Sequence, residues 1–220
     1  MTEQEKPQNQ ANLFYQASKV TRRQRETVNQ NAAFTIWFTG LSGAGKSTIA
    51  TELDSWLFDN HYYSYVLDGD NTRIGINKDL SFSRADRGEN IRRVAEICKL
   101  FNDAGIICIA SFISPFADDR QKARDIIGPD SFIETFIDTS IETCKQRDTK
   151  GLYQLAESGM LPDFTGISSP FDLPLNPDIH IKTDLKSVDE CVNEIIITLA
   201  RVKKIREINL KTLPTSADKH

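Results

Sequence analysis

Eight residues in the first quarter of the chain have the types and spacing that hold a polyphosphate. Residues 40–47 read Gly-Leu-Ser-Gly-Ala-Gly-Lys-Ser and match the pattern G-x-x-x-x-G-K-[ST] in full. Glycines let the backbone curl so that successive N–H groups point at one anion, and a helix starting there adds the positive end of its dipole. We expect Lys46 to reach the β- and γ-phosphates of a nucleoside triphosphate and the Ser47 hydroxyl to hold Mg²⁺. The candidate nucleotide ligands are Gly40, Leu41, Ser42, Gly43, Ala44, Gly45, Lys46, Ser47 and Thr48.

Acidic side chains follow the next apolar segment, which ends Leu67-Asp68-Gly69-Asp70. A carboxylate there would lie beside the phosphate loop, where an acceptor hydroxyl has to sit. Asp70 is therefore the candidate for orienting or deprotonating that hydroxyl, and it is a second candidate ligand for Mg²⁺. A turn with a capping Asp is the structural alternative, which applies more strongly to Asp68. The later apolar segment 106–113 ends in Ser114-Pro115 rather than in the acid that usually supports Mg²⁺.

A local excess of arginine follows on a chain whose net charge is −4. Guanidinium groups suit phosphate and sulfate oxygens, and Arg73 and Arg87 flank the candidate site. For Arg84, Arg92 and Arg93 a solvated helix face is the better interpretation. Phe82 lies close to them in sequence and either stacks on an aromatic base or belongs to the core.

Composition excludes several classes of protein. The net charge of −4 lacks the basic footprint of a nucleic-acid partner. No apolar run approaches the roughly 18 to 20 residues that cross a bilayer, so we expect no membrane partner. The polar, acidic N-terminus argues against a secretory or transit segment and favours the cytoplasm, where the four widely spaced cysteines would be buried and reduced. A guanine-binding switch needs Asn-Lys-x-Asp, and Asn77-Lys78-Asp79-Leu80 lacks the final Asp and comes too early.

Alternating strands and helices must position these residues. Periodicity and turn residues predict strands near 34–39, 63–67, 106–113, 132–137 and 179–181. Helices are expected near 18–30, 47–58, 83–104, 118–127, 141–147 and 188–206, and the Gly- and Pro-rich segment 148–177 is expected to be mostly loop and to form a lid. This order predicts one α/β domain over 12–206, a P-loop-type three-layer α/β/α fold with a parallel five-stranded sheet. Residues 1–11 are expected to be disordered and 207–220 to form a polar tail.

Taken together, these strings resemble the adenylylsulfate kinase family over most of the chain. The resemblance lies in residues 40–47, in Leu67-Asp68-Gly69-Asp70-Asn71 with Arg73, and in the segment 86–93. Residues 111–115, the strings Gln146-Arg147-Asp148 and Lys150-Gly151-Leu152-Tyr153, and residues 164–167 complete it. The phosphate loop alone is shared by many enzymes, whereas the later strings in this order are far more specific.

The resemblance implies transfer of the γ-phosphate of MgATP to the 3′-hydroxyl of adenosine 5′-phosphosulfate (APS), in a cytoplasmic homodimer. It implies that Lys46, Asp70 and Ser114 are catalytic residues. It also implies that the adenine of APS lies between Phe82 and Phe164, and that the base of ATP contacts Arg147 and the loop after the fifth strand. The implied sulfonucleotide ligands are Asp70, Asn71, Arg73, Phe82, Arg87, Asn90, Ile113, Ser114, Lys150 and Phe164. Ser114 aligns with a serine described in the family as a phosphorylated intermediate, but direct in-line transfer needs only positioning, so we favour a binding role.

The lid departs from the family pattern. Gln154-Leu155-Ala156-Glu157 replaces the usual Lys-Lys-Ala-Arg, Ala117 replaces a residue that is often basic or polar, and Ser81 replaces a glycine. Each lost charge-assisted contact would remove roughly 1.5 to 3 kcal/mol if those side chains touch phosphate. The altered lid leaves open a kinase for another nucleotide or small hydroxyl compound, while the intact Lys46 and Asp70 argue against a non-catalytic nucleotide-binding relative.

Overall fold

Strands and helices alternate along the chain, as the sequence predicts. The structure is a computed structural model and describes residue 14 and residues 16–206; the segments 1–11 and 207–220, for which disorder and a polar tail are expected, lie outside the described residues. The elements are α1 (Arg22–Asn29), β1 (Thr35–Thr39), α2 (Lys46–Asp59), β2 (Ser64–Asp68), α3 (Gly69–Ile74), α4 (Arg84–Asp103), β3 (Ile107–Ser111), α5 (Ala117–Ile127), the 3₁₀ turn η2 (Pro129–Ser131), β4 (Phe132–Asp138), α6 (Ile141–Gln146), α7 (Leu152–Glu157), β5 (Ile179–Lys182) and α8 (Val188–Arg201).

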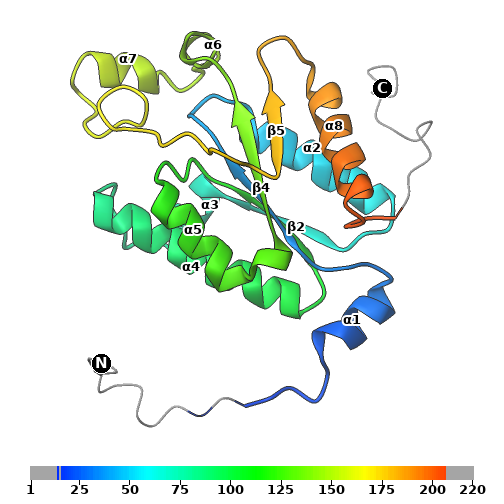
Figure 1. Ribbon diagram of the computed structural model, residues 1–220. Helices are drawn as coiled ribbons and strands as arrows, with labels where there is room; N and C mark the ends of the chain where they lie inside the picture. Colours follow the sequence, from blue (N-terminus) through cyan, green and yellow to red (C-terminus); the bar gives the residue numbers. More distant parts are fainter. Residues whose placement is uncertain (1–13, 15, 207–220) are drawn as a thin grey trace.

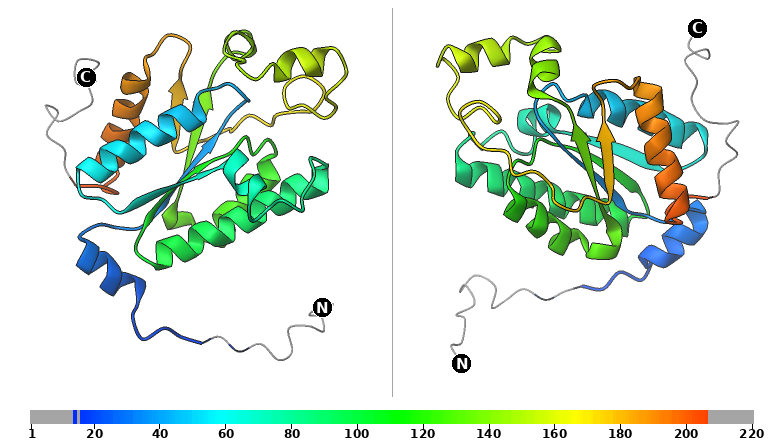
Figure 2. Two further views of the ribbon diagram at one scale, coloured as in Figure 1. Left: turned by 180° about the vertical axis from the view of Figure 1, so that it is seen from behind. Right: turned by 45° about the horizontal axis from the view of Figure 1, so that its top comes forward.

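The five strands form one parallel sheet in the order β2-β3-β1-β4-β5. Every pairing is parallel, and β1 lies at the centre, with Trp37 opposite Ala110 of β3 and Glu134 of β4. Helices α2 and α8 cover one face of the sheet and α4 and α5 cover the other (Figures 1 and 2). The predicted three-layer α/β/α fold with a parallel five-stranded sheet is confirmed.

Side chains of the central strand divide between the two faces with the period of two that a strand imposes. Ile36 and Phe38 are fully buried in the cluster that includes Leu53 of α2 and Ile195 of α8. Trp37 points the other way and packs with residues of α4 and α5. A strand buried on both faces is expected where helices cover both sides of a parallel sheet. All four cysteines are buried and free, as predicted.

The loops that follow parallel strands meet at one edge of the sheet. The phosphate loop follows β1, α3 follows β2, Ser114 comes shortly after β3, α6 follows β4 and Thr183 follows β5. In Figure 1 this edge is the upper one, next to α6 and α7. The carboxyl edge of an open α/β sheet is where such folds bind ligands, so the sequence-predicted site residues are brought to the same side.

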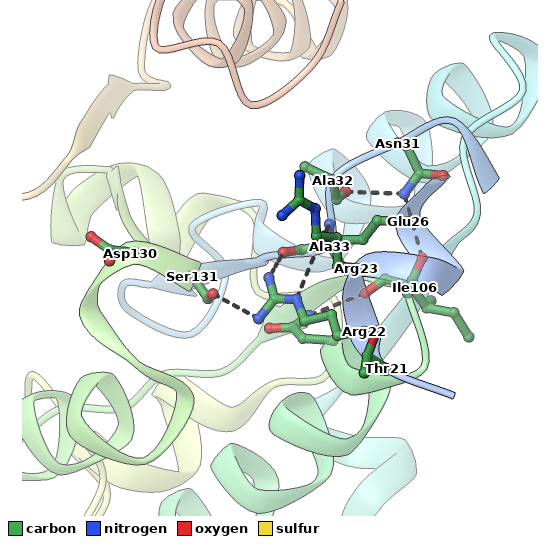
Figure 3. Close-up of polar contacts among 12 residues, drawn as sticks. Thr21, Arg22, Arg23, Glu26, Asn31, Ala32, Ala33, Ile106, Asp130 and Ser131 are labelled. Carbon is green, nitrogen blue, oxygen red and sulfur yellow. Dashed lines mark hydrogen bonds and ion pairs between the residues drawn. The ribbon is translucent and has the colours of Figure 1, made fainter. Parts of the chain in front are cut away.

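Helix α1 lies at the opposite edge of the sheet, away from the phosphate loop (Figure 1), and Figure 3 shows its polar contacts. Thr21 caps it. Arg22 donates to the Ser131 hydroxyl at 3.1 Å and to the Ala33 carbonyl, while Glu26 accepts from Arg22 at 3.0 Å and from the Ala33 amide at 2.8 Å. These contacts fix α1 to the start of β1 and to η2.

Two short α-helices were not predicted. The first is α3, which starts because the Asp68 carboxylate accepts from the Asp70 amide at 3.0 Å. The second is α7, inside the segment expected to be mostly loop, where Asp148 accepts from the amides of Leu152 and Tyr153 at 3.0 and 2.7 Å. In both places an aspartate satisfies amides that a helix start leaves without partners.

Several element boundaries also differ from expectation, and helix α1 begins at Arg22 rather than near residue 18. Strand β3 ends at Ser111 rather than at residue 113, close to the turn in which Ser114 has a φ of 39°. Helix α8 ends at Arg201 rather than near residue 206. Among the described residues, no helix combines the length and apolar character that spanning a membrane requires.

Candidate active site

The phosphate loop packs so closely on its neighbours that glycine is required. A Cβ on Gly40 would lie 2.4 Å from the carbonyl oxygen of Ile137, and one on Gly43 would lie 2.9 Å from that of Cys144. Gly43 and Gly45 also have φ values of 75° and 94°, which disfavour other residues. The loop is therefore seated against the end of β4 and against α6, and it ends where α2 begins, with Thr48 exposed on the first turn of that helix.

Lys46 is folded back over the loop that it belongs to. Its ammonium donates to the carbonyl oxygens of Gly40 and Leu41 at 3.0 and 2.7 Å, and the residue is 8% exposed. Burial lowers the pKa of Lys46 from 10.5 to about 8, and the nearby Asp68 and Asp70 carboxylates act in the opposite direction. An incoming phosphate would stabilise this partly desolvated charge.

Three oxygen atoms meet beside the loop in a set that fits Mg²⁺. The Ser47 hydroxyl donates to the Asp68 carboxylate at 2.6 Å and lies 3.4 Å from the Ser111 hydroxyl. Carboxylate and hydroxyl oxygens are the ligand type that Mg²⁺ prefers, usually with several waters retained. No group of three or more His, Cys, Asp or Glu residues that could hold a metal occurs in the described part of the chain. Sequence reasoning gave Asp68 mainly a capping role and missed its contact with Ser47.

Asp70 has a different partner from Asp68. It lies in the first turn of α3, its side chain is 70% exposed, and it forms an ion pair with Lys150 of the lid segment 148–177. The two predicted residues, far apart in sequence, are thus brought together. Asp70 also lowers the acidity of its partner, because their hydrogen bond raises the pKa of Lys150.

Two guanidinium groups lie close to one aromatic ring on the connection from α3 to α4. Phe82 is 61% exposed, so the ring is not part of the core. The Arg73 guanidinium is 4.3 Å and that of Arg87 is 5.8 Å from the centre of the Phe82 ring. Partial burial lowers the pKa of both arginines. An exposed ring flanked by two cations is suited to an anionic ligand that carries a flat base.

The other predicted ligands near this cluster lie at different depths. Asn90 is 5% exposed, and its carbonyl oxygen accepts from the Asn77 amide at 3.0 Å, while Asn71 is exposed on α3. Ser114 is 2% exposed, and its hydroxyl accepts from the Trp37 indole at 3.1 Å. Ile113, next to it, is half-buried. The Ser114 hydroxyl is therefore engaged inside the protein rather than presented at the surface.

The lid segment 148–177 contacts the site at several points. The Tyr153 hydroxyl donates to the Ser42 carbonyl at 2.9 Å, and Phe164, 9% exposed, meets the Tyr153 ring edge-on at 4.9 Å. Arg87 donates to the Thr165 hydroxyl at 3.1 Å and to the Asp163 carbonyl at 2.6 Å. A cavity of about 650 Å³ lies between Leu41 of the phosphate loop and residues 166–171 and 173. The lid segment therefore contacts the phosphate loop directly, through Tyr153 and Ser42.

The residues that depart from the family pattern face outward or make local contacts. Gln154 and Leu155 are exposed on α7, and Glu157 pairs with Lys145 of α6 at 2.6 Å. Ser81 donates to the Asp86 carboxylate. The Ala117 amide donates to the Asp172 carboxylate at 3.0 Å.

Arg147 joins the end of α6 to the loop after β5. It donates to the hydroxyl and the carbonyl of Thr183, both at 3.1 Å. A Cβ on Gly45 would lie 4.0 Å from the Arg147 guanidinium, so Arg147 borders the phosphate loop, on the side expected for the nucleotide base.

The sequence predicts that Arg84, Arg92 and Arg93 lie on a solvated face of their helix, and this prediction holds for only some of them. Arg92 and Arg93 pair with Glu89 of their own helix. Arg84, half-exposed, instead reaches across to α5, where it pairs with the buried Asp119 at 2.7 Å and lies 3.9 Å from the centre of the Phe116 ring.

Comparison with known proteins matches this geometry to one family. The family model described as adenylylsulphate kinase matches residues 32–182. The adenylyl-sulfate kinase of Clostridium kluyveri is 50% identical over 185 residues, which is 84% of this chain and 92% of the relative. That of Marinobacter nauticus is 47% identical over 196 residues, 89% of this chain and 98% of the relative.

A solved structure agrees with the sequence relatives. The APS kinase CysC of Mycobacterium tuberculosis, in complex with AMPPNP and APS, is 44% identical, with a TM-score of 0.74, and covers 77% of this chain and 98% of its own. The matched region includes the phosphate loop, the Asp70 turn, the α4 arginines and the lid. The chain belongs to the adenylylsulphate kinase family.

Proposed function

We infer that this chain is an ATP-dependent kinase that phosphorylates the 3′-hydroxyl of APS, giving 3′-phosphoadenosine 5′-phosphosulfate and ADP in sulfate activation. The observation that carries this assignment is that one site combines two different kinds of binding surface, each of which forms half of it. One half is a phosphate loop with a lysine; the other is an exposed Phe82 flanked by Arg73 and Arg87. The first half suits a triphosphate donor, and the second suits a nucleotide acceptor with a strongly anionic tail.

Phosphoryl transfer asks the protein mainly for positioning and charge stabilisation. The N–H groups of the loop and the Lys46 ammonium hold the β- and γ-phosphates. Ser47 and Asp68 would hold Mg²⁺, which when bound neutralises charge on the phosphate oxygens. Because Asp68 meets Ser47 directly, we assign the metal to this pair and leave Asp70 for the acceptor.

Asp70 orients the 3′-hydroxyl of the acceptor and takes its proton as the new O–P bond forms. Lys150, its ion-pair partner, keeps the carboxylate in place and provides positive charge near the transferred group. Arg73 and Arg87 bind the phosphosulfate, and Phe82 stacks on adenine from one side, with Phe164 of the lid on the other. Asn71, Asn90 and Ile113 complete the wall of this pocket.

We assign Ser114 a structural and binding role rather than that of a phosphorylated intermediate. Its hydroxyl accepts from Trp37, and its residue is 2% exposed. A covalent phosphoserine would require that hydroxyl to leave the indole and reach the γ-phosphate. Direct transfer to the acceptor requires no such movement.

Substrate profiling with purified enzyme tests the reaction. ADP release from MgATP should be strongest with APS and much weaker with AMP or adenosine, because only APS offers the sulfate charge to the two arginines. A preference for AMP, for a nucleoside or for another small hydroxyl compound would overturn the assignment.

We further propose that the chain acts as a homodimer in the cytoplasm. The resemblance to the adenylylsulphate kinase family supports this. Light scattering of the eluted protein should give about twice the mass of 24.8 kDa. A mass near 25 kDa, or one near the sixfold value suggested by the hexameric APS kinase of Thiobacillus denitrificans, would contradict the dimer.

A further inference from the structure

We propose that Tyr153 is a positioning residue that couples the phosphate loop to the lid. Tyr153 belongs to α7, 111 residues after Ser42 in sequence, yet its hydroxyl donates to the Ser42 carbonyl at 2.9 Å. This inference rests on one part of the proposed function, the binding of MgATP at the phosphate loop, because it gives Tyr153 a part in binding the donor nucleotide. It extends that function to a residue whose role neither the motif nor the comparisons supply.

The contact controls the direction of a phosphate-binding amide. A carbonyl and the following N–H belong to one planar trans peptide and point in opposite directions. Holding the Ser42 carbonyl toward Tyr153 therefore directs the Gly43 N–H to the other side of the loop. Gly43 has a φ of 75° and no side chain to fix its orientation, so an external hydrogen bond is an effective restraint.

The same residue also contacts the lid. Tyr153 is 2% exposed, and its ring meets the edge of Phe164 at 4.9 Å between centroids. Asp148 accepts from the Tyr153 amide at 2.7 Å and so fixes the start of α7. Burial raises the pKa of Tyr153, so its hydroxyl remains a donor across the physiological range. One side chain thus joins the triphosphate loop to the ring that we assign to the acceptor.

Coupling of this kind is reciprocal. When a nucleotide fixes the loop amides, the Ser42 carbonyl is fixed as well, and it favours the position of α7 seen here. When α7 is displaced, the Ser42–Gly43 peptide is free to turn. Donor binding should therefore order the lid before the acceptor arrives.

The test removes only the hydroxyl. Tyr153→Phe keeps the ring against Phe164, and we expect it to weaken binding of Mg–AMPPNP, measured by calorimetry, by about three- to tenfold, the range of one neutral hydrogen bond. Tyr65→Phe, an exposed tyrosine on β2, is the matched control and should change the affinity less than about twofold. An unchanged affinity in Tyr153→Phe would overturn the proposal.

A second measurement reports on the lid itself. Lys150 is the single basic residue of the segment 148–177, so tryptic cleavage after it measures lid opening. Saturating Mg–AMPPNP should slow this cleavage in the wild type and slow it much less in Tyr153→Phe. Equal protection in the two proteins would refute the coupling even if the affinity had changed.

A third measurement needs no variant. In the unmodified protein, Mg–AMPPNP should slow amide hydrogen exchange in residues 152–157, and unchanged exchange there would also overturn the proposal. None of the three measurements uses APS. A failure of APS turnover would therefore count against the proposed function and leave this inference standing, and the reverse also holds.

Discussion

The exposed carboxylate of Asp70 has one partner in the structure and needs another in the proposed reaction. It pairs with Lys150 in the described structure, and in the proposed reaction it must face the acceptor hydroxyl. We expect Asp70→Asn to lower kcat by about 10² to 10⁴, since the amide accepts a hydrogen bond but takes no proton. The affinity for Mg–AMPPNP, measured by calorimetry, should change less than about twofold.

Asp79→Asn is the matched control for this prediction. Asp79 is also an exposed carboxylate in an ion pair, with Arg93 at 2.8 Å, and its loss should leave kcat nearly unchanged. A kcat for Asp70→Asn that equals the wild-type value would remove Asp70 from the chemistry.

Lys46 makes nucleotide binding dependent on pH. Its pKa in the free protein is about 8, lowered from 10.5 chiefly by burial. Below that pH the ammonium is charged and ready for phosphate; above it, the proton must be taken up again on binding. The dissociation constant of Mg–AMPPNP should thus be flat up to about pH 7.5 and then rise, approaching about tenfold per pH unit.

Lys46→Met supplies the comparison, because without the amine the dissociation constant should be higher and independent of pH over the same range. Calorimetry at half-unit steps from pH 6.5 to 9.5 measures both profiles. A wild-type profile that stays flat to pH 9.5 would show that the ammonium is not the titrating group.

At the scale of elements, the long segments were predictable and the short ones were not. Strand β1 follows from its run of β-branched and aromatic residues before Gly40, and helix α4 follows from its apolar spacing. Helices α3 and α7 have six residues each, too few for a periodic pattern, and they depend on caps from Asp68 and Asp148. The same limit hid the contact between Asp68 and Ser47, because which of two neighbouring aspartates faces the loop depends on the turn between them.

Tyr153 illustrates the other limit of the sequence. It was visible only as part of a family string, since its partner Ser42 lies more than a hundred residues away and offers a backbone oxygen. No residue type marks a backbone acceptor. By contrast, Arg73 and Arg87 stood out as a local excess of charge, and the structure brings both to one ring.

Helix α4 presents two arginines that should behave very differently. Arg87 reaches Phe82 and the lid at Thr165 and Asp163, whereas Arg92 pairs with Glu89 and Glu96 on its own helix. Arg87→Ala should raise the KM for APS by about 10- to 100-fold, the loss of a charge-assisted contact. The KM for ATP should change less than about threefold, and Arg92→Ala should change neither. Initial-rate kinetics with both substrates varied would decide the matter, and equal effects on the two KM values would argue against a role in binding the acceptor.

Across the whole molecule, one buried arginine joins segments that are distant in sequence. Arg120 of α5 is 4% exposed and pairs with Glu134 of β4 at 2.7 Å. It also donates to the carbonyl of Ser114 at 2.9 Å and to that of Asp172 at 2.8 Å. A helix, the sheet, the turn after β3 and the far end of the lid therefore share one guanidinium.

Removing that guanidinium should cost stability because the largely buried Glu134 carboxylate loses its ion-pair partner and the carbonyls of Ser114 and Asp172 each lose a donor; the Ser114 carbonyl keeps only the Thr39 hydroxyl at 3.3 Å. We expect Arg120→Ala to lower the free energy of unfolding by about 3 to 5 kcal/mol, a fall in Tm of roughly 6 to 20 °C for a chain of this size. Arg124, 3.8 Å from Glu134, compensates in part and favours the lower end of that range. Lys122→Ala, on the same helix and 67% exposed, should change Tm by less than about 2 °C.

The double variant Arg120→Met/Glu134→Leu distinguishes the effect of the buried ion pair from the effect of the hydrogen bonds that Arg120 donates to the two carbonyls. Replacing both members of a buried ion pair by apolar side chains often restores stability, so we expect Tm to recover much of the loss. The carbonyls of Ser114 and Asp172 would still lack the hydrogen bonds from Arg120, and the lid would be less firmly held at its far end. Tryptic cleavage after Lys150 should therefore remain faster than in the wild type although Tm recovers. If cleavage returned to the wild-type rate together with Tm, Arg120 would stabilise the sheet alone and the lid would be anchored elsewhere.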